Sequence, residues 1–146
     1  MTDPLRELLD RQAIVDLTIA YTYALDTKSW DDLDRVFLAD ATADLTEPLG
    51  DREAIKARIR RALEHLDVSQ HMVSNHEIRI DGDDATCRCY LQAQHVRQAA
   101  PGSPNFIVAG RYDDRLVRTA DGWRIRHRVL EIMWTDGNPQ VARGRD

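Results

Sequence analysis

Residues 85–97 read ATCRCYLQAQHVR and alternate between two kinds of side chain along the whole stretch. One set of alternate positions is small or apolar and ends in a histidine; its members are Cys87, Cys89, Leu91, Ala93 and His95. The other set carries arginine and glutamine. Because successive side chains of a strand point to opposite faces, the pattern predicts a long strand with one buried face.

The same periodicity extends over the second half of the chain and changes in the first half. Further strands are expected over residues 68–80, 106–118 and 123–134, with a short one over 41–45. Apolar residues recur at helical spacing over 5–26, and helices are also expected over 29–37 and 52–66. Helices followed by a meander of long strands indicate one α+β domain over residues 1–135, with a polar, flexible tail over 136–146.

Composition narrows the functional classes. The 146 residues carry a net charge of −5, which gives no support to nucleic-acid binding. Arg58, Arg60 and Arg61 are the nearest candidate for a basic patch, but their helical pattern and acidic neighbours predict a solvated helix face. No run reaches membrane-spanning length, and the opening MTDPLREL is not a signal segment, so a cytoplasmic protein is expected.

Two polar residues stand out against the apolar pattern. His95 continues the buried face of its strand and needs a partner there, although a satisfied core histidine is the simpler interpretation. Asp26 ends the first helix, where the helix dipole disfavours a carboxylate unless a cation or donor offsets it. His71 lies in a strand that must cross beneath this helix, so an Asp26–His71 pair acting as a general base is plausible; the alternative is an aspartate that faces water.

The remaining candidates are weaker. His127 shares parity with the apolar positions of its strand and is a minor interior candidate, while His65 suits a helix end and His76 is out of phase with His71. The spacing of Cys87 and Cys89 disfavours a disulfide between them, and two cysteines alone do not make a metal site. No metal-binding, phosphate-binding or nucleophile-elbow motif is present, so neither a metal nor a cofactor is expected.

The sequence resembles the SnoaL-like branch of the nuclear transport factor 2-like superfamily over nearly its whole length. The stretches that carry the resemblance are YTYALDTKSWDDLDRVFLADA (21–41), QHMVSNHEIRIDGDDA (70–85), CYLQAQHVR (89–97), GRYDDRLVRTADGWRI (110–125) and EIMW (131–134). The resemblance implies a cone-shaped barrel, in which N-terminal helices wrap a curved, mainly antiparallel sheet around a pocket. This scaffold hosts many chemistries, so the function has to be argued from the site.

Three enzyme types of this superfamily match at the candidate residues. Scytalone dehydratase is similar at Asp26, His71 and His95. Hexachlorocyclohexane dehydrochlorinase is similar at the first two and implies an active-site arginine at Arg128, which reaches the pocket only if a bulge shifts its strand. Bile-acid 7α-dehydratase adds a functional tyrosine at Tyr21. Tyrosines that scytalone dehydratase uses fall on Leu25 and Leu45, and its pocket asparagine falls on Tyr112, so no specific substrate carries over.

Three functions remain open. The first is a cofactor-independent dehydratase-type lyase acting on a small hydrophobic cyclic hydroxy-carbonyl compound, with Asp26, His71, His95 and Tyr21 as catalytic residues. The second is an isomerase or cyclase of a ketosteroid-like or polyketide-like substrate, and the third is a non-catalytic ligand-binding or assembly module. The expected substrate-binding residues are Tyr112, Arg128, Leu25, Leu45, Met72, Asn75, Met133 and Trp134.

A homo-oligomer is also expected. Tyr90, Leu130, Ile132 and Trp134 fall on outward positions of the strands, and apolar groups there suggest a covered surface. The similar dehydratases are trimers, which favours a trimer over a dimer. Scattered surface apolar residues are the ordinary alternative.

Overall fold

The computed structural model describes residues 3–143. In chain order these form α1 (Pro4–Asp26), η1 (Trp30–Arg35), β1 (Phe37–Asp44), β2 (Pro48–Gly50), α2 (Arg52–Leu63), β3 (Val68–Asp81), β4 (Asp84–Val96), β5 (Asn105–Thr119), β6 (Gly122–Gly137) and η2 (Pro139–Ala142). No helix within these residues is long and apolar enough to span a membrane.

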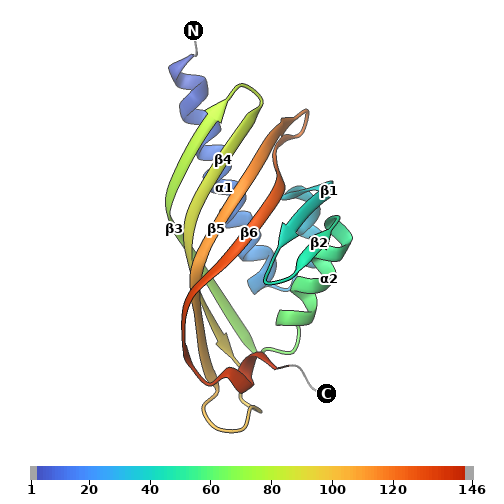
Figure 1. The fold of residues 1–146 in the computed structure, drawn as a ribbon, viewed down its shortest axis with the longest axis vertical. Helices are drawn as coiled ribbons and strands as arrows, with labels where there is room; N and C mark the ends of the chain where they lie inside the picture. Colours follow the sequence, from blue (N-terminus) through green and yellow to red (C-terminus); the bar gives the residue numbers. More distant parts are fainter. Residues whose placement is uncertain (1–2, 144–146) are drawn as a thin grey trace.

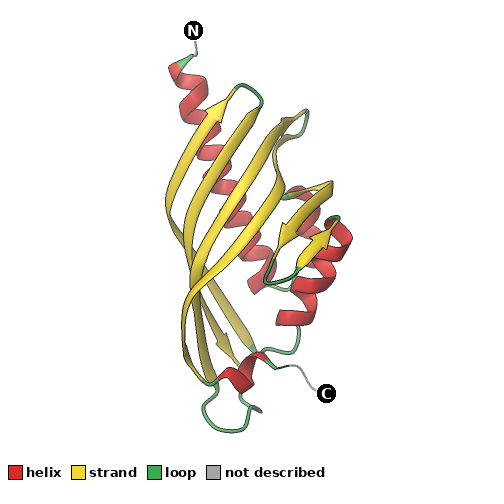
Figure 2. Cartoon of the chain, in the orientation of Figure 1, coloured by secondary structure: helices red, strands yellow, loops and turns green. Residues whose placement is uncertain are grey.

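The six strands form one curved sheet in the order β2-β1-β6-β5-β4-β3. All neighbouring pairs are antiparallel except β1 and β6, which run parallel. Figures 1 and 2 show α1 running along one face of the long strands and α2 lying beside β1 and β2. The predicted α+β cone is confirmed; its sheet stays open, with β2 and β3 at its edges.

Helix α1 follows the predicted pattern. Asp3 caps it by accepting the Leu5 backbone N–H at 3.0 Å, and Pro4 occupies the first turn, where a missing N–H costs nothing. Its apolar stripe is buried against the sheet and comprises Ile14, Leu17, Tyr21, Ala24 and Leu25. The first two turns extend past the β3–β4 hairpin, so the leucines there are exposed.

Strand β4 has the predicted alternation. Cys87, Cys89, Leu91, Ala93 and His95 are all buried, and both cysteines are free thiols. The alternate side chains face outward. The inward face of β4 consists mostly of small side chains, which leaves space for a cavity next to it.

Two bulges in β6 change which of its side chains face inward. Arg115 pairs with His127 and Leu116 with Ile125, which leaves Arg126 as the extra residue; Met133 is extra at the second bulge. A one-residue insertion reverses the facing of all residues beyond it. Arg128, Leu130 and Ile132 therefore face inward.

These bulges correct three expectations. Leu130 and Ile132, predicted to face outward, line the interior cavity. His127, a minor interior candidate, faces outward, and its Nδ1 lies 2.6 Å from the Thr42 hydroxyl. Gly110 is required at the second bulge, because a Cβ there would lie 2.3 Å from the Glu131 carbonyl oxygen.

Strand β3 has its own irregularity at Asn75, whose φ of 58° is left-handed. The pairing with β4 shifts register between Ser74 and Glu77. As a result His76, expected to be out of phase, turns toward α1, where its Nε2 lies 2.8 Å from the Thr18 hydroxyl. Burial lowers the pKa of His76.

The C-terminal segment is more ordered than predicted. Residues 136–137 complete β6, and Val141 in η2 is fully buried. The Val141 carbonyl lies 3.2 Å from Nε2 of His65, two residues past the end of α2. The expected flexible tail is therefore packed on the domain as far as residue 143, and residues 144–146 lie outside the described part.

Candidate active site

The centre of the site is a hydrogen-bonded Asp26–His71 pair. The Asp26 Oδ1 lies 2.6 Å from His71 Nδ1, and its Oδ2 accepts the His71 backbone N–H at 2.8 Å. The Ser69 hydroxyl donates to Oδ1 at 3.0 Å. These donors offset the unfavourable position of a carboxylate at the C-terminal end of α1. The chain thus brings together the two residues that the sequence analysis paired.

The electrostatics keep Asp26 ionised. Burial acts to raise the pKa of the Asp26 carboxyl, but the hydrogen bonds from the His71 ring, the His71 backbone and Ser69 outweigh it and lower that pKa. An ionised carboxylate at Nδ1 fixes a proton on that nitrogen and leaves Nε2 with its lone pair. In this arrangement Nε2 can accept a proton, and Asp26 is placed to stabilise an imidazolium at His71.

The turn after Asp26 is held by Lys28. This residue has a left-handed φ of 56°, and its ammonium group donates to the carbonyls of Leu66 at 2.6 Å and Glu64 at 3.1 Å. These contacts join the end of α1 to the segment that leads into β3. Lys28 thereby fixes the two backbones that carry Asp26 and His71.

His95 lies beside the pair as a second, electrically different histidine. Its ring centroid is 6.0 Å from that of His71, and its Nδ1 is 3.3 Å from the Phe106 carbonyl oxygen. Burial, with a further contribution from nearby His71, lowers the pKa of His95 to about 4. His95 is therefore a neutral imidazole near pH 7, with Nδ1 donating to the carbonyl and Nε2 able to accept.

The depressed pKa of His95 predicts a pH-dependent stability. The ordinary pKa of histidine is 6.5, and the pKa of His95 in the folded protein is about 4. Between these two pH values the histidine is protonated in the unfolded chain and neutral in the folded protein. The free energy of unfolding therefore decreases as the pH falls from 6.5 to about 4. The total decrease due to His95 is about 3 kcal/mol. Urea unfolding at several pH values should show this slope, and His95→Gln should flatten it. An unchanged slope in that variant would assign the effect to other groups.

A second buried cluster lies behind the cavity wall. Arg128 is fully buried and donates to both oxygens of Asp114 at 2.7 Å each. Its guanidinium carbon lies 4.3 Å from the Tyr21 ring and 3.9 Å from the Tyr112 ring, within the range of cation–π contact. The two tyrosine rings meet edge to face at 5.6 Å. Arg128 thus supports both tyrosines.

Burial raises the pKa of both Tyr21 and Tyr112, and the Arg128 charge opposes this shift at each ring. Both phenols are therefore neutral and able to donate. Both line the cavity, whereas Arg128 and Asp114 do not belong to its lining. Arg128, expected to contact substrate, lies behind the two tyrosines and outside the cavity lining.

The sequence analysis did not single out Asp114 or Ser69. Strand parity could have found both, since Asp114 lies two residues after Tyr112 and Ser69 two residues before His71.

The predicted lining residues are divided between two hollows. An interior cavity of about 630 Å³ contains His71, His95, Tyr21 and Tyr112 in its wall, together with Leu25 and Leu45. A second hollow of about 1020 Å³ is lined by Met72, Asn75, Met133 and Trp134, and shares Asp26 and His71 with the site. His71 is thus common to both.

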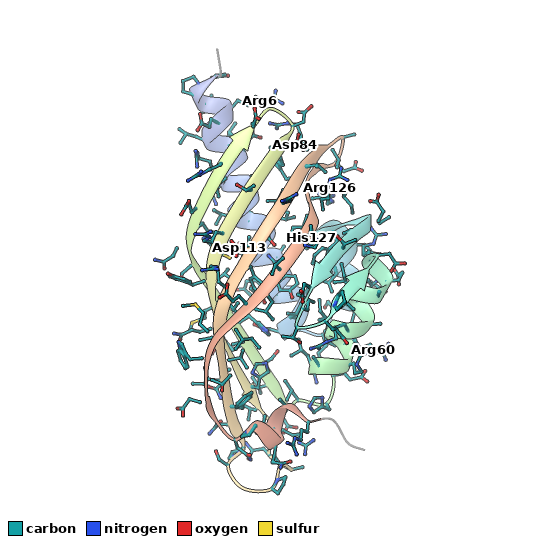
Figure 3. All side chains as sticks on the ribbon, viewed as in Figure 1. Arg6, Arg60, Asp84, Asp113, Arg126 and His127 are labelled. Atoms are coloured by element: carbon teal, nitrogen blue, oxygen red, sulfur yellow. The ribbon has the colours of Figure 1, made fainter. Side chains whose placement is uncertain are left out.

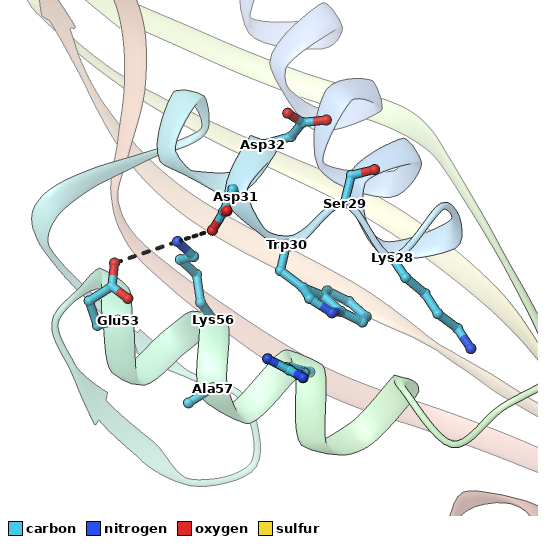
Figure 4. A pocket seen from close by; sticks show the side chains of 9 residues that line it. Lys28, Ser29, Trp30, Asp31, Asp32, Glu53, Lys56 and Ala57 are labelled. Atoms are coloured by element: carbon cyan, nitrogen blue, oxygen red, sulfur yellow. Dashed lines mark hydrogen bonds and ion pairs between the residues drawn. The ribbon is translucent and has the colours of Figure 1, made fainter.

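A third hollow, between η1 and α2, is shown in Figure 4. Its Lys56 ammonium group lies 3.0 Å from carboxylate oxygens of both Asp31 and Asp34, and 3.6 Å from Glu53. These partners already neutralise the lysine. Within residues 3–143, no three histidine, cysteine or acidic side chains gather as a metal site requires.

Comparison with known sequences gives one family. The model of the SnoaL-like domain matches residues 6–129. The uncharacterized protein Rv2910c of Mycobacterium tuberculosis is 38% identical over 128 residues, which cover 84% of this chain and 85% of that protein.

Comparison with solved structures gives the same fold. The Kfla4162 protein of Kribbella flavida has a TM-score of 0.87 at 29% identity and covers 94% of this chain and 99% of its own. A candidate scytalone dehydratase of Novosphingobium aromaticivorans has a TM-score of 0.81 at 23% identity, covering 89% and 88% of the two chains. A hexachlorocyclohexane dehydrochlorinase has a TM-score of 0.80 at 15% identity, covering 92% of each.

Proposed function

Because the chain belongs to the SnoaL-like family of the nuclear transport factor 2-like superfamily, we propose that it is a cofactor-independent lyase of the dehydratase type. The substrate is a small hydrophobic cyclic hydroxy-carbonyl compound. The observation that carries the proposal is the 2.6 Å Asp26–His71 contact in the wall of a largely apolar cavity. A purely structural histidine does not need a carboxylate that holds it as a base.

The reaction begins when His71 Nε2 removes the proton on the carbon next to the carbonyl. Negative charge then develops on the carbonyl oxygen, and the neutral phenols of Tyr21 and Tyr112 donate hydrogen bonds to it. The hydroxyl on the neighbouring carbon leaves as the double bond forms. The leaving oxygen takes the proton from the His71 imidazolium, so that one water is released and the base is regenerated.

His95 has a supporting part in this scheme. Its pKa of about 4 leaves almost no imidazolium near neutral pH, so it is a poor proton donor. As a neutral ring it can accept a hydrogen bond from the substrate hydroxyl and align it for departure. The sequence analysis counted His95 among the catalytic residues; in this scheme it positions the substrate, and His71 carries both proton transfers.

Two of the structures with the same fold have names that describe a reaction. A candidate dehydratase and a dehydrochlorinase have the same fold, and both names describe eliminations. At 23% and 15% identity the likeness carries the fold alone, so the chemistry rests on the site.

The proposal is tested by product mass. Cyclic β-hydroxy ketones are incubated with the protein without added cofactor, and products lighter by one water are expected. A product of unchanged mass would indicate the isomerase or cyclase alternative, in which the abstracted proton returns elsewhere. If no compound is converted, the binding-module alternative gains support.

We also propose that the protein assembles as a homotrimer through the outward face of the sheet. Met72, Tyr90 and Trp134 are 57%, 46% and 47% exposed, and all three line the second hollow described above. Light scattering after size-exclusion chromatography should give three times the chain mass, and Trp134→Asp should shift the protein toward the monomer. A monomeric wild-type protein would contradict the proposal.

A further inference from the structure

The charged side chains in the cavity lining are of one sign. Arg58 and Arg61 reach it from α2, and among residues 3–143 no aspartate or glutamate belongs to its wall. The rest of the lining is mostly apolar, apart from the histidines and tyrosines described above. The sequence pattern had placed both arginines on a solvated helix face.

The two arginines share one partner. Glu47, in the β1–β2 connection, contacts Arg58 Nε at 2.9 Å and Arg61 Nη2 at 2.8 Å through the same oxygen. Arg58 also lies 3.4 Å from the Leu45 carbonyl and the Thr46 hydroxyl. Two guanidinium groups against one carboxylate leave a net charge of +1 at this part of the wall.

The degree of burial ranks the two arginines. The Arg58 side chain is 25% exposed and that of Arg61 is 66% exposed, while Glu47 is 46% exposed. The Glu47 contact is thus open to solvent and screening, so an incoming anion can compete for the guanidinium donors. Because the Arg58 side chain is less exposed, it should contribute more to the binding of an anion than Arg61.

We propose that Arg58 and Arg61 form an anion subsite of the cavity, which takes a hydrophobic ligand with a carboxylate at one end. Guanidinium groups bind carboxylates through paired, charge-assisted hydrogen bonds. The apolar body of the ligand occupies the cavity, with its other end toward His71. This inference deepens the proposed function, since it makes the substrate an acidic hydroxy-carbonyl compound.

The test compares two probes of the same shape, 2-naphthoate and the neutral 2-naphthamide, by isothermal titration calorimetry on the full chain at low ionic strength. The acid should bind about tenfold more tightly than the amide, the equivalent of about one charge-assisted hydrogen bond. Added salt should weaken only the acid. Equal affinities, or no binding of either probe, would overturn the proposal.

Variants on and near α2 test whether the preference for the acid comes from Arg58 and Arg61. Arg58→Gln should remove most of the preference for the acid, and Glu47→Gln should increase it by freeing both arginines. Arg60→Gln removes the same charge from the outer side of α2, where Arg60 pairs with Glu64, and should change nothing. If Arg60→Gln lost as much of the preference for the acid as Arg58→Gln, the preference would come from the net charge of the protein, and the proposal would be overturned.

Two further variants separate this inference from the proposed reaction. Ala93→Phe fills the cavity and should block both probes, which places them inside it. His71→Ala should still distinguish acid from amide, whatever becomes of turnover. Loss of the preference in His71→Ala would mean that the anion is bound at the histidines, and the subsite would be refuted.

Discussion

Replacing His71 with alanine is expected to lower kcat by about 10²–10⁴-fold, the usual contribution of a positioned general base. The protein should stay folded, because Asp26 keeps the Ser69 hydroxyl and the backbone N–H of residue 71 as donors. Asp26→Asn should have an effect of the same kind, since the base would lose the carboxylate that fixes its tautomer. Rates of water loss from the converted hydroxy ketone, with circular dichroism as the folding check, give the measurement.

The matched control for this prediction is His127→Ala. Like His71, His127 lies in the sheet, but it faces away from the cavity and contacts the Thr42 hydroxyl. Full activity there and loss at position 71 would assign the base. If His71→Ala retained wild-type turnover, the base assignment would be wrong.

The largest stability effect is expected at Asp114. Arg128 is fully buried, and Asp114 accepts two of its hydrogen bonds. Removing one partner of a buried ion pair leaves an uncompensated charge and typically costs about 3–5 kcal/mol. Asp114→Asn should therefore lower the free energy of unfolding by about this amount in urea denaturation.

Asp113→Asn is the natural control, one residue away. Asp113 pairs with Arg88 and Arg111 on the partly exposed outer face, so its loss should cost no more than about 1 kcal/mol. Replacing Asp114 and Arg128 together with leucine and methionine should recover most of the stability. Similar costs at 113 and 114 would contradict the account of the buried pair.

The Arg128 cluster also bears on the proposed mechanism. If Arg128 acts through Tyr21 and Tyr112, the Asp114 change should disturb the tyrosine donors as well as the fold. A charge behind the phenols strengthens them as donors while leaving the cavity wall apolar. The sequence resemblance placed Arg128 at the site but could not assign it this indirect role.

Much of the fold was predictable because hydrophobic periodicity reports it directly. Each long helix and strand was located to within a few residues, since α1 and β4 bury whole faces with clear 3.6-residue and two-residue periods. The C-terminal segment departed from prediction for a different reason. Although this segment is mostly polar, Val141 is buried and the Asn138 side chain donates to the carbonyls of Pro101 and Ser103.

The sequence by itself determined the positions of the long helices and strands and made Asp26–His71 a candidate pair, with His95 as the other possible partner of Asp26. A carboxylate at a helix C-terminus needs a donor, and His71 lies in the strand expected to cross beneath that helix. Strand parity separately pointed His95 toward the interior. Only the tertiary structure decided the facing of residues beyond Asn75 and Arg126. Period-two alternation is reversed by one extra residue, and a bulge exists only in relation to the neighbouring strand. That physical reason also explains why Arg128 faces inward and His127 faces outward. The two arginines of α2 line the cavity for another reason, which is where the helix packs on the sheet.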